Sequence, residues 1–436
     1  MRLNSQSIRH MSAGKKTPQF AKGAGIWTSA KGAPVAIDQA INQADKSRGL
    51  AFAITNEKPY RWGEVLPYFW LRDNCRCGTC INQDTRQRNF DTFELPEDIG
   101  PVRITTNEAG LEIEWSHGSH ISFYRWDFLE SYMKGARPEP DDVPFVYFGS
   151  EGHANSSIEI EYAEFFKDET HAVGRLTDRI KRNGYAVVIG VPTESAKPTE
   201  DLLRKIGPIR ETHYGGFYDF TADMKYADTA YTNIPLALHT DNTYFTDPSG
   251  VQAFHLLSHT VAGSVKGSGS DLGGQSSLLD GFYAAHIMKE EAPDLFEVLA
   301  NVGVPYHASG NKGIAISPDE LYPVLEYNTE RNIMHRIRWN NDDRGVVFPG
   351  GKYSIMQWYK AAAKWREILA RKELVYWFQL KPGNLLLFNN YRLLHGRSAF
   401  VGIRRICGGY INYDDFISRW RNTNYPRDQV LKQVTG

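Results

Sequence analysis

The sequence has 436 residues, of which 41% are hydrophobic and 23% are charged, and its formal net charge is −1. This length exceeds what one hydrophobic core usually supports, so two or three domains are expected. The charge leaves no bulk electrostatic case for nucleic-acid binding, and no apolar run approaches the roughly 18 residues of a membrane span.

The N-terminal segment is basic. The first 37 residues contain no Asp or Glu, but they carry six Lys and Arg together with several Ser and Thr. That composition is typical of a mitochondrial transit peptide, and it is equally typical of a disordered basic tail. We therefore expect residues 1–46 to be either a disordered or a transit segment.

Residues 47–136 have the pattern of a small β domain. Short apolar runs at 51–54, 68–71 and 101–104 predict strands. The remaining predicted elements are a hairpin with its turn at 107–110, a helix at 126–132 and a Pro- and Asp-rich linker at 137–142.

Three of the four cysteines, Cys75, Cys77 and Cys80, lie within six residues of one another. This crowding is not typical of a disulfide framework and indicates a reducing compartment with a metal site. A structural zinc ion needs four ligands, and His120, which begins a predicted strand, is the candidate for the fourth. A redox thiol cluster and unligated surface cysteines are the alternatives.

Residues 145–436 combine helical patterns with many short strands. An apolar stripe from Tyr162 to Ile180 predicts one helix that Gly184 ends. A strand is predicted at 185–189, and a helix at 199–206 has Thr199 as its expected cap. Further helices are predicted at 282–289, 292–300 and 355–369, and the Gly- and Ser-rich stretch 263–272 is expected to be a flexible surface loop.

His239 and Asp241 lie two residues apart in a segment of strand character. Because residues i and i+2 of a strand point to the same face, both side chains are able to bind one metal ion. His395, after the apolar run 385–388, is the candidate third ligand. Two His and one carboxylate form the ligand set of non-heme Fe(II) oxygenases.

The triplet gains weight from its context, since a His two residues before an acid is common by chance. Arg404 follows His395 by nine residues in a second run of strand character. A guanidinium stays charged and bonds a carboxylate through two parallel N–H donors, so Arg404 suits a dicarboxylate cosubstrate.

Three stretches, 239–245, 274–282 and 394–397, resemble the carnitine-biosynthesis dioxygenases, which form the γ-butyrobetaine dioxygenase family of Fe(II)/2-oxoglutarate oxygenases. The resemblance extends over about residues 47–425. It implies a mainly β protein with helices: a double-stranded β-helix, or jelly-roll, catalytic domain at 145–436 and a small N-terminal β domain at 47–136. In that small domain it implies a zinc site formed by Cys75, Cys77, Cys80 and His120.

The resemblance also implies a ligand set for the active site. His239, Asp241 and His395 would hold iron, while Arg404 and, less strongly, Ser276 would bind 2-oxoglutarate. A quaternary ammonium cannot donate hydrogen bonds, so aromatic faces are the fitting recognition chemistry. The family's aromatic cage corresponds to Tyr214, Tyr218, Tyr231 and Tyr410. Tyr218 stands where relatives carry Trp, which gives a weaker face.

Two further residues bear on the substrate. Asp228 stands where the butyrobetaine enzymes have Asn, and an Asp there repels a free carboxylate but pairs with an α-ammonium. Asn340 resembles the family residue that contacts the other end of the substrate, so we expect it to bind the α-carboxylate.

These expectations favour hydroxylation of N6,N6,N6-trimethyllysine at C3, the first step of carnitine biosynthesis, with O2 as the oxidant and ascorbate as a reductant. Hydroxylation of γ-butyrobetaine is the alternative, and a non-catalytic zinc-containing interaction module is the rival of a different class. Mammalian members are mitochondrial, so we expect the mitochondrial matrix, with the cytoplasm as the alternative. We also expect a homodimer.

Overall fold

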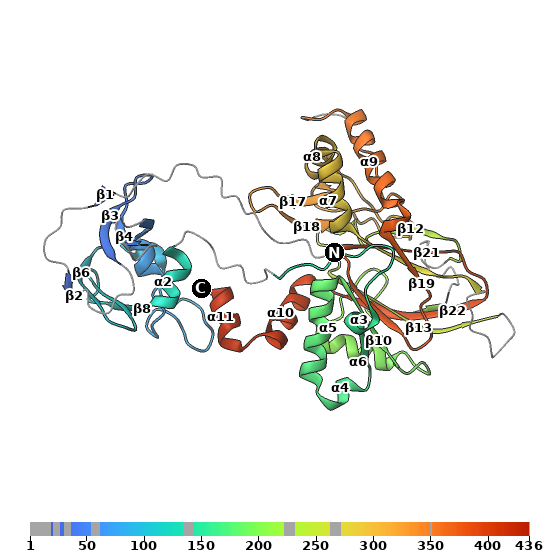
Figure 1. Ribbon diagram of the computed structural model, residues 1–436, viewed down its shortest axis with the longest axis horizontal. Helices are drawn as coiled ribbons and strands as arrows, with labels where there is room; N and C mark the ends of the chain where they lie inside the picture. The colour runs from blue at the N-terminus through green and yellow to red at the C-terminus, as the bar shows by residue number, and fades with distance from the viewer. Residues whose placement is uncertain are drawn as a thin grey trace. The chain divides into compact units, whose positions relative to one another are not determined.

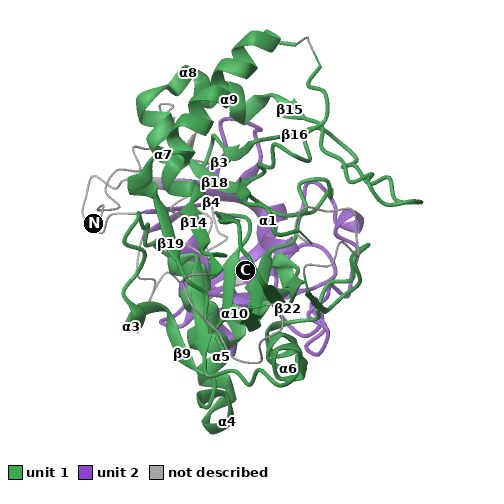
Figure 2. Ribbon diagram, turned by 90° about the vertical axis from the view of Figure 1, so that its right-hand side faces the viewer, with its two compact units in different colours: residues 1–4, 143–426 green, residues 5–142, 427–436 purple. Residues whose placement is uncertain are grey.

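The structure is a computed structural model that describes residues 19–20, 27–29, 36–53, 62–133, 143–221, 232–261, 272–348 and 351–435. The chain divides into two compact units, one of residues 1–4 and 143–426 and one of residues 5–142 and 427–436 (Figure 2). Among the described helices, none is long and apolar enough to cross a membrane.

The larger unit is built on two sheets. The six-stranded sheet has the order β11 (Tyr218–Thr221), β22 (Ile403–Ile411), β13 (Val251–Thr260), β20 (Leu385–Asn389), β10 (Tyr185–Ile189) and β9 (Glu159–Glu161). The four-stranded sheet has the order β12 (Leu236–His239), β21 (Leu393–Arg397), β14 (Ser276–Asp280) and β19 (Val375–Phe378).

Strand β20 shows why the predicted run 385–388 is continuously apolar. Its five residues are all buried, because both of its faces are covered. Leu386 and Phe388 pack between the two sheets, together with Leu278 of β14. The alternate residues Leu385 and Leu387 face the other way, into a second cluster under the helices. A strand covered on both faces reads as an unbroken apolar run, with no alternation to mark it.

Helices α5 (Glu169–Asn183), α6 (Lys197–Ile206) and α10 (Tyr413–Asn424) cover the outer face of the larger sheet (Figure 1). The unit therefore mixes helix and sheet, and its jelly-roll core fits the expected double-stranded β-helix.

Two details of these helices differ from the prediction. The stripe from Tyr162 to Ile180 forms two helices, α4 (Glu164–Lys167) and α5, because Asp168 between them is extended and caps α5 through the His171 N–H. Gly184 ends α5 in the left-handed conformation, as predicted. Helix α6 begins earlier than predicted, with Ala196 as its cap. The Thr199 hydroxyl lies 2.6 Å from the His255 ring instead.

A helical layer formed by α7 (Gly281–Glu291), α8 (Pro293–Asn301) and α9 (Ile355–Leu369) packs around one further apolar cluster (Figure 1). These three helices confirm the predictions at 282–289, 292–300 and 355–369. Smaller elements complete the unit: α3 (Asn155–Ile158), β15 (Gly303–Val304), β16 (Tyr322–Pro323), β17 (Leu325–Asn328), β18 (Ile333–Ile337) and the 3-10 helix Lys372–Leu374.

The smaller unit contains two four-stranded sheets. One has the order β1 (Gln19–Phe20), β3 (Ile37–Ile41), β4 (Arg48–Ala53) and β5 (Trp62–Pro67); the other has the order β2 (Trp27–Ser29), β6 (Pro101–Thr106), β7 (Gly110–Trp115) and β8 (Ile121–Arg125). The unit's helices are α1 (Tyr68–Asp73), the 3-10 helix Thr92–Glu94, α2 (Trp126–Met133) and α11 (Arg427–Thr435).

In this unit the hairpin β6–β7 and helix α2 are as predicted. The strand predicted at 68–71 is wrong, because these residues begin α1. Their burial explains the error: Tyr68 and Leu71 are the buried pair, a spacing of three that only a helix places on one face. Part of the segment 1–46 is also ordered, since β3 pairs with β4. The linker 137–142 and residues 263–271 lie outside the described residues.

Candidate active site

The three predicted metal ligands come together at one end of the four-stranded sheet. His239 is the last residue of β12 and lies directly opposite His395 of β21 in the strand register. Asp241 follows two residues later in a turn, beyond the strand. The turn, and not the alternation of a strand, therefore brings the carboxylate back to the imidazoles.

The spacing of these groups suits a metal ion. The Oδ1 atom of Asp241 is 3.1 Å from His239 Nε2 and 3.7 Å from His395 Nε2. Metal bonds of about 2.0–2.2 Å to N and O place neighbouring ligand atoms about 3 Å apart. The other ring nitrogen of His239, Nδ1, lies 2.8 Å from the Ala237 carbonyl oxygen. A carbonyl only accepts, so the Nδ1 hydrogen is fixed there and Nε2 is directed to the site.

Electrostatics separates the two imidazoles. Burial alone would lower the pKa of His239, but the hydrogen bond and charge of Asp241 raise that pKa to about 9. Burial, together with the charge of His239, lowers the pKa of His395 to about 3. Burial opposes ionisation of Asp241, yet the two imidazoles and the Tyr410 hydroxyl lower its pKa well below the usual range. The cluster thus keeps a carboxylate and a neutral imidazole ready for a metal ion.

Asn390 holds the backbone of Asp241, and sequence reasoning missed it. Its Oδ1 accepts the Asp241 N–H at 2.8 Å, and its Nδ2 donates to the Asp241 carbonyl at 3.1 Å and to Ser249 O at 2.8 Å. The side chain is 1% exposed and sits in the connection between β20 and β21. The strand that carries His395 is therefore fastened to the turn that carries Asp241.

A cavity of about 440 Å³ opens beside the His–Asp–His cluster. Its lining includes His239, Asp241 and His395. One part of the lining holds Arg397, Arg404 and Ser276. Arg397 was missed by sequence reasoning, although it ends one of the quoted motifs. In the register of β14 and β21 it lies opposite Ser276.

The guanidinium groups of Arg397 and Arg404 pair with no carboxylate among the described residues. The Nε atoms of both Arg397 and Arg404 have no hydrogen-bond partner among the described residues, and Arg397 otherwise donates to the carbonyls of Thr232 and Ile234. Burial lowers the pKa of Arg397 to about 10; burial and the Arg397 charge lower that of Arg404 to about 9. Both stay protonated at neutral pH, so the described lining at this end of the cavity supplies no compensating anion.

Aromatic side chains form another part of the lining. Tyr214, Tyr218 and Tyr410 all face the cavity, and the Tyr218 and Tyr410 rings meet edge to face at 5.9 Å. The Tyr218 hydroxyl donates to Ala253 O at 2.7 Å, so its ring is held in place. Sequence reasoning missed Tyr244, which also lines the cavity and belongs to the same motif as His239. Asp228 and Tyr231 lie outside the described residues.

Asn340 lines the cavity beside two acidic residues that were not predicted, Asp342 and Asp343. Its Nδ2 donates to Asp343 Oδ2 at 2.8 Å, and its Oδ1 accepts the Asp342 N–H at 3.0 Å. These two bonds orient the amide and leave one N–H of Asn340 for a ligand. The cavity therefore presents acceptors and carboxylates in this region and cations at Arg397 and Arg404.

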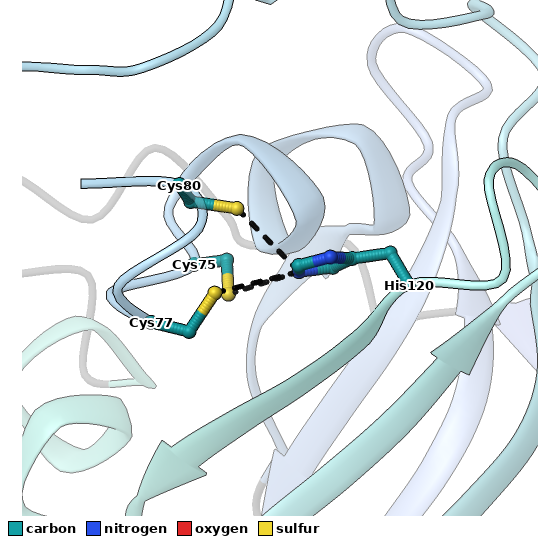
Figure 3. Close-up of side chains that lie close together, drawn as sticks. All are labelled: Cys75, Cys77, Cys80 and His120. Carbon is teal, nitrogen blue, oxygen red and sulfur yellow. Dashed lines mark hydrogen bonds between the residues drawn. The ribbon is translucent and has the colours of Figure 1, made fainter. Parts of the chain in front are cut away.

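The smaller unit holds the second cluster, formed by Cys75, Cys77, Cys80 and His120 (Figure 3). His120 Nε2 lies 3.4 Å from the Sγ atoms of Cys75 and Cys80 and 3.8 Å from that of Cys77. Tetrahedral zinc with Zn–S of about 2.3 Å and Zn–N of about 2.05 Å puts these atoms about 3.6 Å apart. Burial raises the pKa of Cys80 to about 12, so a bound cation is what would make this thiol ionise.

Comparison with known families gives two matches along the chain. Residues 142–410 match the family described as taurine catabolism dioxygenase TauD, TfdA, and residues 45–130 match a domain described as gamma-butyrobetaine hydroxylase-like, N-terminal. The first match contains the His–Asp–His cluster and the cavity, and the second contains the cysteine cluster.

Curated relatives extend over most of the sequence. The chain is 51% identical over 395 residues to a trimethyllysine dioxygenase of Neurospora crassa, covering 85% of this chain and 83% of the relative. It is 34% identical over 360 residues to the human protein named trimethyllysine dioxygenase, mitochondrial, covering 81% and 82%. A gamma-butyrobetaine dioxygenase of Pongo abelii is 27% identical over 369 residues, covering 82% and 90%.

Proposed function

The chain belongs to the taurine catabolism dioxygenase TauD, TfdA family, and from this membership we propose that it hydroxylates N6,N6,N6-trimethyllysine at C3. It is an Fe(II)- and 2-oxoglutarate-dependent dioxygenase. Its reaction, which forms 3-hydroxy-N6,N6,N6-trimethyllysine, is the first step of carnitine biosynthesis. The observation that carries the proposal is a single cavity that joins a His–Asp–His cluster to two arginines, which pair with no carboxylate among the described residues.

We assign the cosubstrate to the arginine end. 2-Oxoglutarate carries two carboxylates, and a desolvated pair of guanidinium groups is stabilised by such an anion. Arg404 would bind the distal carboxylate, with Arg397 and Ser276 beside it. His239, Asp241 and His395 would hold the iron, which when bound supplies the open coordination positions at which O2 and the keto acid react.

The remaining lining suits the substrate's charges. Trimethyllysine carries a quaternary ammonium, an α-ammonium and a carboxylate, whereas γ-butyrobetaine has no N–H donor at all. The faces of Tyr214, Tyr218 and Tyr410 would receive the quaternary ammonium, with Tyr231 as the further cage residue from the sequence motif. We propose that Asn340 binds the α-carboxylate and that Asp228 pairs with the α-ammonium.

We propose that Cys75, Cys77, Cys80 and His120 bind one structural zinc ion, since four protein ligands leave no open position for chemistry. Vertebrate relatives carry the word mitochondrial in their names. With the basic N-terminal segment, this supports the proposal of a mitochondrial matrix location. Ascorbate as the reductant and a homodimer as the assembly are proposals that oxygen-uptake assays and sedimentation would test.

The experiment is a turnover assay with purified protein, Fe(II), 2-oxoglutarate and either amine. Succinate should form with trimethyllysine, together with a product that is one oxygen heavier and hydroxylated at C3 by NMR. Succinate formation that depends on γ-butyrobetaine instead would replace the substrate. No succinate with either amine would favour the non-catalytic zinc module.

The substrate assignment has its own variant. Asp228→Asn should reduce kcat/KM for trimethyllysine by about tenfold to a hundredfold, because it removes the charge that pairs with the α-ammonium. Fe(II) affinity should stay unchanged. Asp342→Asn, which removes an acid of the described cavity lining, separates a general loss of negative charge from the specific one. Unchanged kinetics for Asp228→Asn would remove the basis of the substrate assignment.

A further inference from the structure

Asp241 has two carboxylate oxygens, and they have different surroundings. Oδ1 faces His239 Nε2 at 3.1 Å and His395 Nε2 at 3.7 Å. Oδ2 accepts two hydrogen bonds, one from Gln252 Nε2 at 2.5 Å and one from the Tyr410 hydroxyl at 2.7 Å. The carboxylate is thus divided into an oxygen turned to the imidazoles and an oxygen held by donors.

The sheet places both donors side by side. Gln252 on β13 and Tyr410 on β22 are direct partners in the antiparallel register, so their side chains leave the same face of the sheet. The residues on either side of Gln252, Val251 and Ala253, face the opposite way, into the apolar cluster under the helices. Gln252 is therefore the position of this strand from which a side chain reaches Asp241.

Packing does not explain a glutamine here. Gln252 is 1% exposed, and its Oε1 has no hydrogen-bond partner among the described residues. A buried, unpaired amide oxygen is destabilising, whereas an apolar side chain of similar size carries no such cost. Its printed hydrogen bond is the one to Asp241 Oδ2, and only the NH2 group is able to donate it.

We propose that Gln252 is a positioning residue that, together with Tyr410, restricts Asp241 to metal binding through Oδ1 alone. The inference rests on the proposed iron site and deepens it. Two donors on Oδ2 oppose rotation of that oxygen toward the metal, so the carboxylate does not take a second position. The positions needed by the cosubstrate and O2 then stay free.

The test uses the full-length protein, stripped of iron but with zinc retained at the cysteine cluster, and titrated anaerobically with Co(II). The visible absorption of Co(II) reports both affinity and coordination number. Gln252→Met keeps the length of the side chain but removes the donor, and it should weaken Co(II) binding about tenfold and change the band intensity. Gln252→Glu sets a second carboxyl against Oδ2 and should weaken binding further, about a hundredfold.

Gln39→Met is the matched control. Gln39 is a buried strand glutamine of the smaller unit, 4% exposed and far from the metal cluster in sequence, so the same substitution there should leave the titration unchanged. The unfolding midpoint of each variant, measured without iron or Co(II), shows whether that variant folds. Wild-type affinity and spectrum in a folded Gln252→Met protein would overturn the inference while leaving the proposed function intact. A wild-type protein that binds no Co(II) would overturn both.

Discussion

Arg397 and Arg404 share a buried wall of the cavity, yet the neighbouring Arg405 does not. Arg405 is half exposed and forms a two-point ion pair with Asp219, at 2.8 and 2.6 Å. Consecutive residues of one strand point to opposite faces, so Arg404 and Arg405 occupy different environments. This pair of neighbours provides a variant and its control at adjacent positions.

Replacing Arg404 with Met should raise KM for 2-oxoglutarate by about a hundredfold or more, because the distal carboxylate loses its bidentate partner inside a desolvated site. Arg397→Met should have a smaller effect of the same sign. Arg405→Met is the control and should leave KM unchanged. Steady-state succinate formation at varied 2-oxoglutarate measures all three, and equal KM values for wild type and Arg404→Met would remove the cosubstrate assignment.

Individual residues were predictable where a chemical spacing marks them. The residues His239, Asp241 and His395 form a recognisable ligand set. Arg404 follows His395 by nine residues, in a run of strand character. No spacing in the sequence identifies Asn390 or Gln252. Each acts through a hydrogen bond to Asp241, which lies 149 residues from Asn390 and 11 residues from Gln252. Arg397 was visible in the sequence but had no partner that would distinguish it from a surface cation.

At the scale of elements, helix α7 begins on a buried ion pair. Asp280 caps the helix by accepting the Tyr283 N–H, and its carboxylate also pairs with Arg392 at 2.6 Å. Both side chains are fully buried, and Arg392 donates further to the carbonyls of Arg182 and Val146. One guanidinium thus joins the start of α7, the end of α5 and the chain that precedes them.

Arg392→Met should lower the free energy of unfolding by about 3–5 kcal/mol, because it leaves the Asp280 carboxylate buried without compensation. Lys197→Met, which removes an exposed i,i+4 pair with Asp201, should leave the unfolding midpoint nearly unchanged. Urea unfolding followed by tryptophan fluorescence compares the two. Similar midpoints would show that the pair does not hold α7.

His255 of β13 gives the larger unit a pH dependence. Burial lowers the pKa of its imidazole to about 4, against about 6.5 when unfolded. Between these values the unfolded chain binds the proton and the folded chain does not, so stability falls as pH drops from about 6.5 to 4. The loss amounts to roughly 3 kcal/mol at most.

His255→Asn should flatten this dependence, whatever it does to stability at neutral pH. Unfolding midpoints measured from pH 7.5 to 4.5 would show a smaller slope than in the wild type. The exposed His286, half of an i,i+4 pair with Glu290, provides the control His286→Asn. An unchanged slope in His255→Asn would assign the dependence to other groups.

Elements were predictable where one period dominated the pattern. The long helix α9 and the hairpin β6–β7 were found from sequence, whereas α5 was predicted as part of one longer helix that starts at Tyr162. The run 68–71 was not, because four apolar residues fit a strand as well as a helix. Thr199 was predicted to be a cap because threonine is a common capping residue. Its hydroxyl instead contacts the ring of His255, which lies 56 residues away.

On the scale of the whole molecule, the proposed zinc site bears on the stability of the smaller unit. The two four-stranded sheets share one apolar cluster, and the segment 75–80 lies beside it with Arg72, which donates to Cys80 Sγ at 3.3 Å. If zinc binds there, much of this unit's stability comes from the metal.

Cys80→Ser should abolish stoichiometric zinc and make residues 36–133 sensitive to protease, while residues 143–426 stay resistant. Cys407→Ser is the control, because Cys407 lies in the larger unit beside His255 and should leave zinc content unchanged. Metal analysis and limited proteolysis provide the readouts. Full protection without zinc would assign the cluster a role other than structural.

The arrangement of the sheets was the part that sequence alone could not give. Strand β13 pairs with β22 and β20, which lie more than 100 residues later, and no local pattern encodes such partners. The resemblance supplied the jelly-roll core in advance. The order of the strands, and with it the meeting of Gln252 and Tyr410, required the structure.

The edge-to-face contact of Tyr218 and Tyr410 has a practical consequence for redesign. The Tyr410 hydroxyl donates to Asp241, a proposed metal ligand, so under the proposed function an exchange at that ring should disturb both cofactor loading and amine recognition. The Tyr218 hydroxyl donates to the main-chain carbonyl of Ala253. Under the proposed function, Tyr218 is therefore the cage residue at which selectivity among quaternary amines is best adjusted.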